Sequence, residues 1–266
     1  MARKISIQMN KKTKKSVANS LDGDLKILPY LPDLLIDLWP LGSALDVIVN
    51  MVQSLNLSSS AHLLDLGCGK GATAITIASR LGLRATGIDA NPEFLKIARQ
   101  KALEHKVSEK CQFILDDIFN YVKQPRKFDL VIFASLGGLF GNFKKTVGQL
   151  RRMVRIGGYI IIDDGYLKGE KTIDKPGYKH YFSHEKCIAQ LLSYGDTLVQ
   201  EVSTVNESRQ INQEYLEIIS KRGHQLVREQ PDLEPLVHRY IDTQKIECDL
   251  IEKFINGAAW MLKKNL

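Results

Sequence analysis

Short apolar runs alternate along most of this chain with stretches whose apolar residues recur at helical spacing. The first run, Leu63 to Leu66, has one polar position, Asp65, and the second, Arg84 to Asp89, ends in an acid. Such runs are typical of buried strands, whereas apolar residues three or four positions apart, as in 73–81, indicate a helix that buries one face. The same reasoning predicts further strands at 111–115, 128–134, 155–166, 196–205 and 257–262.

Three stretches depart from this alternation. Residues 1–24 are polar and basic, and we expect them to form a flexible tail. Residues 25–60 are apolar and broken by prolines, which predicts short helices that form an N-terminal lid. Two helical patterns parted near Pro231 occupy about 206–255 and indicate an inserted cap or a homodimer contact. The main domain is expected to occupy 61–266 and to contain this insertion.

The composition is that of an ordinary globular protein. The chain has 266 residues, of which 44% are hydrophobic and 25% are charged, enough for one large core or a core with a cap. No run of about 18 apolar residues occurs, so no membrane-spanning helix is expected. No apolar secretory segment follows the basic start. The four cysteines form no C-x-x-C pair, which argues against zinc or disulfide frameworks and favours a cytoplasmic location.

The positive charge of the chain is concentrated at its start. The net charge is +7, and six positive side chains precede the first acid, Asp22, so that the remaining chain carries only +1. A nucleic-acid groove needs basic side chains gathered on the folded body. The simpler interpretation is a solvated arm, and nucleic acid is therefore an unlikely partner.

Three glycines at alternate positions, Gly67, Gly69 and Gly71, follow the first strand and precede a helix. Because glycine has no side chain, this turn can bring the backbone close to a ligand. The unpaired amides of the helix start favour a polar or anionic group at the same spot. The loop also satisfies G-x-G-x-x-A through Gly67, Gly69 and Ala72, so that on this loop alone a nicotinamide-dependent oxidoreductase stays open.

The stretch Asp65 to Gly71 resembles motif I of the class I S-adenosylmethionine (SAM)-dependent methyltransferases. In that family the loop wraps the methionine end of SAM, and the acid within the strand braces the loop. A nicotinamide-binding strand usually carries an apolar residue there. Asp89 to Pro92 resembles the segment after motif I. The Asp89 carboxylate, about 20 residues past the glycines, can accept both hydrogen bonds of a ribose diol.

The third predicted strand is followed by two acids, Asp116 and Asp117. Phe113, Asp117 and Ile118 match the pattern with which the family binds adenine, so Asp117 is the first choice for the adenine amine and Asp116 the alternate. Either acid could instead cap a helix. The resemblance implies SAM as the cofactor, held by Asp65, Gly67, Cys68, Gly69, Gly71, Asp89, Ala90, Asn91, Asp116, Asp117, Ile118 and Ser135.

The resemblance also implies a fold and an arrangement of the site. The family fold is an α/β, Rossmann-like, seven-stranded sheet in the order 3-2-1-4-5-7-6, with helices on both faces. The three carboxylates of Asp65, Asp89 and Asp117 are then expected to converge, with the glycine loop, around one SAM molecule.

Two acids, Asp163 and Asp164, end the fifth predicted strand and are the candidate catalytic residues. A carboxylate partly desolvated by a lid has a raised pKa, which suits a base near neutral pH. Their alternative role is to brace a loop. Residues 166–183 are expected to form a substrate lid, and the histidines lack metal-ligand spacing, so no metal is expected.

The stretch 128–134 resembles motif IV of the small-molecule branch of the family. It lacks the N-P-P-Y-like tetrad and the Pro-Cys nucleophile of nucleic-acid methyltransferases. The leading hypothesis is a methyltransferase that moves a methyl group from SAM to an O, N or C nucleophile of a small molecule by in-line displacement. The alternatives are a nicotinamide-dependent oxidoreductase, a catalytically silent SAM-binding partner subunit and, third, a nucleic-acid methyltransferase.

Overall fold

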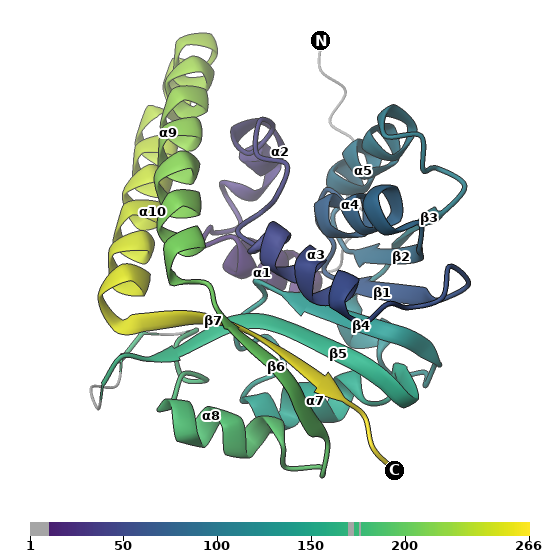
Figure 1. Ribbon diagram of the computed structural model, residues 1–266. Coiled ribbons are helices and arrows are strands. Elements are labelled where there is room, and N and C mark those ends of the chain that lie inside the picture. Colours follow the sequence, from purple (N-terminus) through teal and green to yellow (C-terminus); the bar gives the residue numbers. More distant parts are fainter. Residues whose placement is uncertain (1–10, 170–172, 176) are drawn as a thin grey trace.

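A sheet of seven strands forms the centre of the protein. The computed structural model describes residues 11–169, 173–175 and 177–266, and within them the strand order is β3-β2-β1-β4-β5-β7-β6 (Figure 1). Strands β1 to β5 run parallel, and β7 is antiparallel to both β5 and β6. The strands are β1 (His62–Leu66), β2 (Arg84–Asp89), β3 (Cys111–Leu115), β4 (Phe128–Ala134), β5 (Val154–Leu167), β6 (Thr197–Ser203) and β7 (Ile255–Lys263). The predicted fold class and strand order are confirmed.

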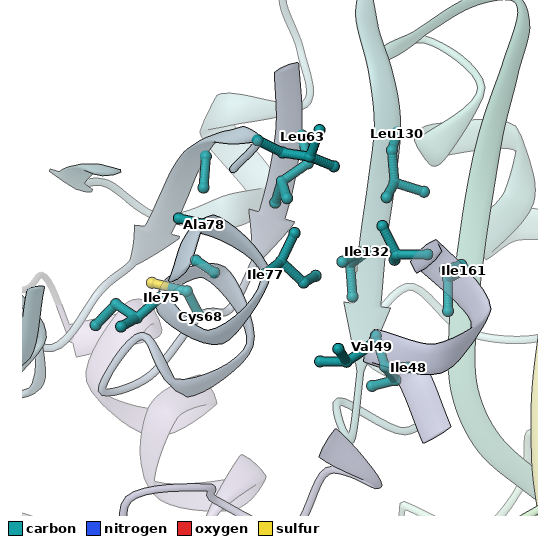
Figure 2. Packing of buried hydrophobic residues seen from close by; sticks show 14 of the residues in the cluster. Ile48, Val49, Leu63, Cys68, Ile75, Ile77, Ala78, Leu130, Ile132 and Ile161 are labelled. Carbon is teal, nitrogen blue, oxygen red and sulfur yellow. The ribbon is translucent and has the colours of Figure 1, made fainter. Parts of the chain in front are cut away.

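Helices cover both faces of this sheet, and successive strand residues bury toward opposite helix layers. Leu63 belongs to the buried cluster on one face, and its neighbour Leu64 belongs to the cluster on the other. Figure 2 shows Ile48 beside Ile132 and Ile161 in the first of these clusters. The first face carries α3 (Leu45–Ser54), α4 (Ala72–Leu81) and α5 (Pro92–Glu104); the second carries α6 (Ile118–Tyr121), α7 (Phe143–Leu150) and α8 (His184–Leu191) (Figure 1).

The ends of the helices next to the glycine loop follow from single residues. Helix α4 ends at Gly82, whose φ of +74° is the left-handed conformation that glycine tolerates at a C-terminus. Helix α5 begins at Pro92, and the Asn91 side chain accepts hydrogen bonds from the amides of Glu93 and Phe94. Gly82 thus leads the chain from α4 into the amino end of β2, and Asn91 and Pro92 lead it from the carboxyl end of β2 into α5.

The expectation of a flexible tail over residues 1–24 is wrong for residues 11–24. Residues Lys11–Ser20 form helix α1, in which Ala18 is buried and Val17 packs against a third hydrophobic cluster. The sequence interpretation weighed the charge of this stretch but not the apolar and small residues on one face of it, which gain enough from burial to hold the helix. Residues 1–10 of the predicted tail lie outside the described residues.

The predicted N-terminal lid contains η1 (Leu28–Tyr30), α2 (Leu31–Leu34) and α3. Its first part packs against the inserted hairpin, which consists of α9 (Val205–Glu229), η2 (Pro231–Leu233) and α10 (Glu234–Phe254) and projects from one end of the sheet (Figure 1). The hairpin therefore caps the N-terminal segment, while its role in a homodimer stays a prediction. Among the described helices, none combines the length and apolar character needed to cross a bilayer.

Candidate functional site

The glycine loop between β1 and α4 takes a conformation that side chains would obstruct. Gly67 and Gly69 have φ values of +72° and +53°. A Cβ atom on Gly67 would lie 2.6 Å from Leu136, and one on Gly69 would lie 2.9 Å from Leu41. Glycine at both positions therefore lets the loop lie close to the Leu136 and Leu41 side chains, while the predicted approach to a ligand stays a prediction.

Asp89, at the carboxyl end of β2, holds this loop in place. Its Oδ2 accepts a hydrogen bond from the Gly69 amide at 2.8 Å, and its Oδ1 accepts one from the Asn91 amide at 2.8 Å. Burial raises the pKa of this carboxyl group, and the two backbone hydrogen bonds oppose that shift. A carboxylate oxygen can accept more than one hydrogen bond, so a ligand could share this group with the backbone.

A cavity opens where β1, β2 and β4 end, the crevice in which open α/β sheets bind ligands. We call it the main cavity. Helix α1 also forms part of its wall through Thr13, Ser16 and Val17, which the sequence interpretation had assigned to the tail. Of the predicted cofactor residues, Gly67, Gly69, Asp89, Ala90, Asp117, Ile118 and Ser135 line it.

The structure separates the two acids after β3. Asp117 lines the main cavity, caps α6 through the Phe119 amide at 2.9 Å, and accepts a hydrogen bond from the Thr13 hydroxyl at 2.5 Å. Asp116 does not line the cavity, and its Oδ1 accepts the Asp117 amide at 2.7 Å. Asp117 is thus both a helix cap and a cavity residue, which the sequence had posed as alternatives.

Asp65 lies in an adjoining space, the side cavity, together with Trp39, Ser43 and Thr73. Its Oδ2 is buried and has no hydrogen-bond partner in the described part of the chain, and burial raises its pKa to about 7. Both cavities share Gly67, Gly69, Leu41 and Ala134 as walls. The prediction that three carboxylates surround one cavity therefore needs a correction: Asp89 and Asp117 line the main cavity, and Asp65 lines its neighbour.

Three predicted cofactor residues have evident structural tasks. Cys68 borders the side cavity, but its sulfur packs in the core near Ile75 (Figure 2). Gly71 lines neither cavity, and a Cβ atom there would lie 2.9 Å from the ring of Phe113, so its glycine serves the packing of α4. Asn91 is fully buried and caps α5.

The two candidate catalytic acids point to opposite sides of β5, as neighbours in a strand do. Asp163 is buried; its Oδ2 accepts the amide of Ala44, just before α3, at 2.9 Å and lies 3.5 Å from the Ser135 hydroxyl. Burial raises its pKa to about 7. Asp164 instead contacts His180, with 3.3 Å between Oδ2 and Nε2. Because Ala44 belongs to the N-terminal lid, the contacts of Asp163 fit a role in bracing that lid.

The lid expected at 166–183 contains His180, which was considered in the sequence only as a histidine without metal-ligand spacing. Its Nδ1 lies 2.8 Å from the carbonyl oxygen of Gly177, and Nε2 faces Asp164. Burial lowers the pKa of His180, but the Asp164 carboxylate and the Gly177 carbonyl oxygen together raise it overall. A Cβ atom on Gly138 would lie 2.6 Å from the His180 ring, so the lid rests against the loop after β4. Lid residues 170–172 and 176 lie outside the described residues.

Comparison with known proteins identifies the family. The sequence model of the family described as "Methyltransferase domain" matches residues 57–229, more than half of the chain. The chain belongs to this methyltransferase family. The predicted membership of the class I SAM-dependent methyltransferases is confirmed, and no finding supports a nicotinamide-dependent oxidoreductase.

Individual relatives of this methyltransferase domain match only in part. A sterol 4-C-methyltransferase of Caenorhabditis elegans is 26% identical over 132 residues, 50% of this chain and 39% of the relative. Norajmaline N-methyltransferase of Rauvolfia serpentina is 30% identical over 101 residues, 38% of this chain and 35% of the relative. The matched part thus spans less than half of these curated relatives.

A solved structure extends the likeness of the fold to most of the methyltransferase chain. The SAM-dependent methyltransferase from Geobacter sulfurreducens, in complex with S-adenosyl-L-homocysteine (SAH), superposes with a TM-score of 0.73 at 20% identity. The superposition covers 84% of this chain and 92% of that one.

Proposed function

We propose that this protein is an enzyme that transfers a methyl group from SAM to an O, N or C nucleophile of a small molecule. The observation that carries the proposal is the main cavity, where the glycine loop meets the Asp89 and Asp117 carboxylates at the carboxyl ends of parallel strands. The names of two relatives, a sterol and an alkaloid methyltransferase, support a small-molecule acceptor.

The donors and acceptors around the two cavities fit SAM. Asp89 would accept hydrogen bonds from the ribose hydroxyls, and Asp117 would accept one from the adenine amine, in exchange for its bond to Thr13. The unpartnered Oδ2 of Asp65 would receive the ammonium group of the methionine end, because a buried carboxylate oxygen gains most from a cationic donor. Gly67 and Gly69 line both cavities with backbone atoms alone.

Bound SAM would supply a methyl group already activated by its positive sulfur, so the protein's task is mainly to align a nucleophile and exclude water. Leu136 lies against Gly67, Leu41 lies against Gly69, and α1 forms part of the wall of the main cavity. The buried Asp163, with its pKa of about 7, borders Ser135 at the end of β4. We assign it a bracing role rather than that of a base.

Titration calorimetry with SAH tests the cofactor site. We expect Asp117→Ala to weaken SAH binding and to abolish the preference for SAH over its inosine analogue, which presents an acceptor instead of the adenine amine. Asp116→Asn is the matched control, because Asp116 does not line the main cavity and asparagine keeps an oxygen that can accept the Asp117 amide. Equal SAH affinity in the wild type and Asp117→Ala would contradict the assignment of Asp117.

Turnover needs its own test, because a silent SAM-binding subunit would bind SAH equally well. The purified protein, SAM labelled in its methyl group and a fractionated small-molecule extract should give a labelled product below about 1 kDa, as expected for a ligand that fits a pocket of ordinary size. The label should be lost when Asp89 is replaced by alanine. If SAH binds but no extract yields a labelled small molecule, the silent subunit is favoured.

A further inference from the structure

Lys70, in the middle of the glycine loop, is one of the most deeply buried side chains of the protein, with 1% of its surface exposed. Lysine is almost never buried this completely unless its ammonium group is paired. Here the ammonium donates hydrogen bonds to the backbone carbonyls of Leu35 and Leu38, the second at 2.7 Å. It also lies 5.6 Å from the centre of the Phe94 ring.

Residues near Leu35 and Leu38 also donate a hydrogen bond back to the glycine loop. The indole Nε1 of Trp39 donates a hydrogen bond to the carbonyl oxygen of Lys70 at 3.1 Å. Both the side chain and the backbone of Lys70 are therefore bonded to residues 35–39, which lie more than thirty positions earlier in the sequence. Packing alone would not require either of these directional bonds.

Residues 35–43, which we call the strap, form one wall of the side cavity. Trp39, Leu41 and Ser43 line that cavity together with Asp65, and Leu41 lies against Gly69. The strap is also bonded to the hairpin, because Arg222 of α9 holds Asp37 through two hydrogen bonds of 2.5 and 2.6 Å. The strap thus lies between the hairpin and the cofactor loop, with a charged side chain on each side of it.

We propose that Lys70 is a positioning residue that holds the strap closed against the glycine loop and so makes the strap part of the SAM site. The inference rests on the proposed function, because only a bound SAM molecule would use the wall that the strap provides. Burial lowers the pKa of Lys70 to about 8, and the Asp37 carboxylate partly opposes this shift, so the ammonium is still present at neutral pH. A charged donor forms stronger hydrogen bonds to carbonyl oxygens than a neutral one.

The ligand-free protein tests the tether directly, because Trp39 is a reporter on the strap itself. The chain has two tryptophans, and the second, Trp260, is fully buried. In a Trp260→Phe background, fluorescence and its quenching by acrylamide report on Trp39 alone. Lys70→Met, which keeps the length and removes the donors, should expose Trp39 to the quencher and shift its emission to longer wavelength.

Lys110→Met is the matched control for this change. The Lys110 ammonium also donates a hydrogen bond to a backbone carbonyl, that of Gly82 at the end of α4, at 3.1 Å. It should leave the quenching of Trp39 as in the parent protein. Lys70→Arg, which retains a cationic donor, should restore much of the protection.

Binding and kinetics complete the test. We expect Lys70→Met to raise the dissociation constant of SAH roughly tenfold, the effect of losing a hydrogen bond to a charged group. The KM for SAM should rise alike while kcat stays within about twofold, because the bonds of Lys70 hold a wall of the site and take no part in the methyl transfer itself. A folded Lys70→Met protein with parental quenching and SAH affinity would overturn the proposal.

The two proposals fail separately. If the parent protein binds no SAH, the proposed function fails, while the quenching comparison in ligand-free protein still decides whether Lys70 holds the strap. If Lys70→Met does not fold by circular dichroism, Lys70→Gln, which keeps one donor group, takes its place in the same measurements.

Discussion

Among single residues, the acids of the candidate site are unusual because burial keeps them protonated to higher pH than acids in water. Burial raises the pKa of Asp65 and of Asp163 to about 7 and also raises that of Asp89. A carboxyl group in this range is half ionised near neutral pH, so a ligand or a pH change can alter its charge at little cost. Asp65 and Asp163 have different surroundings, so we expect a change of pH to act on ligand binding through one and on stability through the other.

The raised pKa of Asp65 leads us to expect that SAH binding strengthens as the pH rises. The unpartnered oxygen of Asp65 favours a ligand ammonium only when the group is ionised, which happens above its pKa of about 7. Between pH 6 and 8 its ionised fraction rises about tenfold, and the association constant of SAH should follow it. Calorimetry at several pH values measures this slope, which should flatten in Asp65→Asn. An equal slope in the two proteins would show that another group titrates.

Asp163 predicts an effect on stability instead. Its pKa is raised from 3.8 to about 7 on folding, so the folded state binds more protons between these values and the buried charge lowers stability as pH rises through this window. Asp163→Asn should therefore raise the free energy of unfolding at pH 8 by up to roughly 4 kcal/mol, and by little at pH 4. Urea titrations at both pH values measure the difference.

The same variant separates bracing from base catalysis. Asparagine can still accept the Ala44 amide but cannot take a proton, so a base would be lost while the brace is kept. Activity within about threefold of the parent fits a brace, whereas a loss of 10²-fold or more would make Asp163 a catalytic base. The activity of Asp164→Asn serves as a comparison, because Asp164 lies on the opposite side of β5.

At the scale of elements, the features that could be predicted are those that depend on residues close together in the sequence. The strands and the glycine loop were predicted because apolar runs and glycine spacing are local signals, and α10 was parted from α9 at Pro231 as expected. Helix α1 was not predicted because its apolar face is short and is buried only by residues of the third cluster that lie far away in the sequence. The burial of Lys70 was unpredictable, since the carbonyls of Leu35 and Leu38 reach it only through the fold.

Helix α1 itself leads to a prediction about the main cavity. Ala18, with 1% of its surface exposed, anchors α1 to the third hydrophobic cluster, and a carboxylate there would be buried without a partner. Ala18→Asp should release the helix rather than unfold the protein, because α1 precedes the rest of the domain. SAH binding should then weaken roughly tenfold, as one wall of the cavity is lost.

The neighbouring residue provides the control for α1. Asn19→Asp introduces the same charge at an exposed position of the same helix. Trypsin should cleave after Lys14 and Lys15 quickly in Ala18→Asp and slowly in Asn19→Asp. Should both variants bind SAH as the parent does, α1 would not be part of the binding site.

For the whole molecule, the three largest of the four buried clusters among the described residues divide the work between fold and site. Two of them pack helices on the two faces of the sheet, and the third joins α1, η1 and α2 to the inserted hairpin. Helix α1 and the strap each form a wall of a cavity, and both pack in this third cluster. The hairpin therefore supports a site that none of its own residues lines. Sequence order conceals this dependence, since the hairpin lies more than 160 residues after the segment it supports.

A pair of core substitutions tests that dependence. Ile219 in α9 belongs to the third cluster, and Leu191 in α8 belongs to the cluster on the far face of the sheet; both are fully buried. Ile219→Ala and Leu191→Ala should each lower the free energy of unfolding by about 2–5 kcal/mol, because each leaves a cavity. Only Ile219→Ala should also raise the SAH dissociation constant, roughly fivefold, because it loosens the packing beneath α1 and the strap. Calorimetry below the unfolding temperature of both variants makes the comparison, and equal SAH affinities would show that the site does not depend on the hairpin.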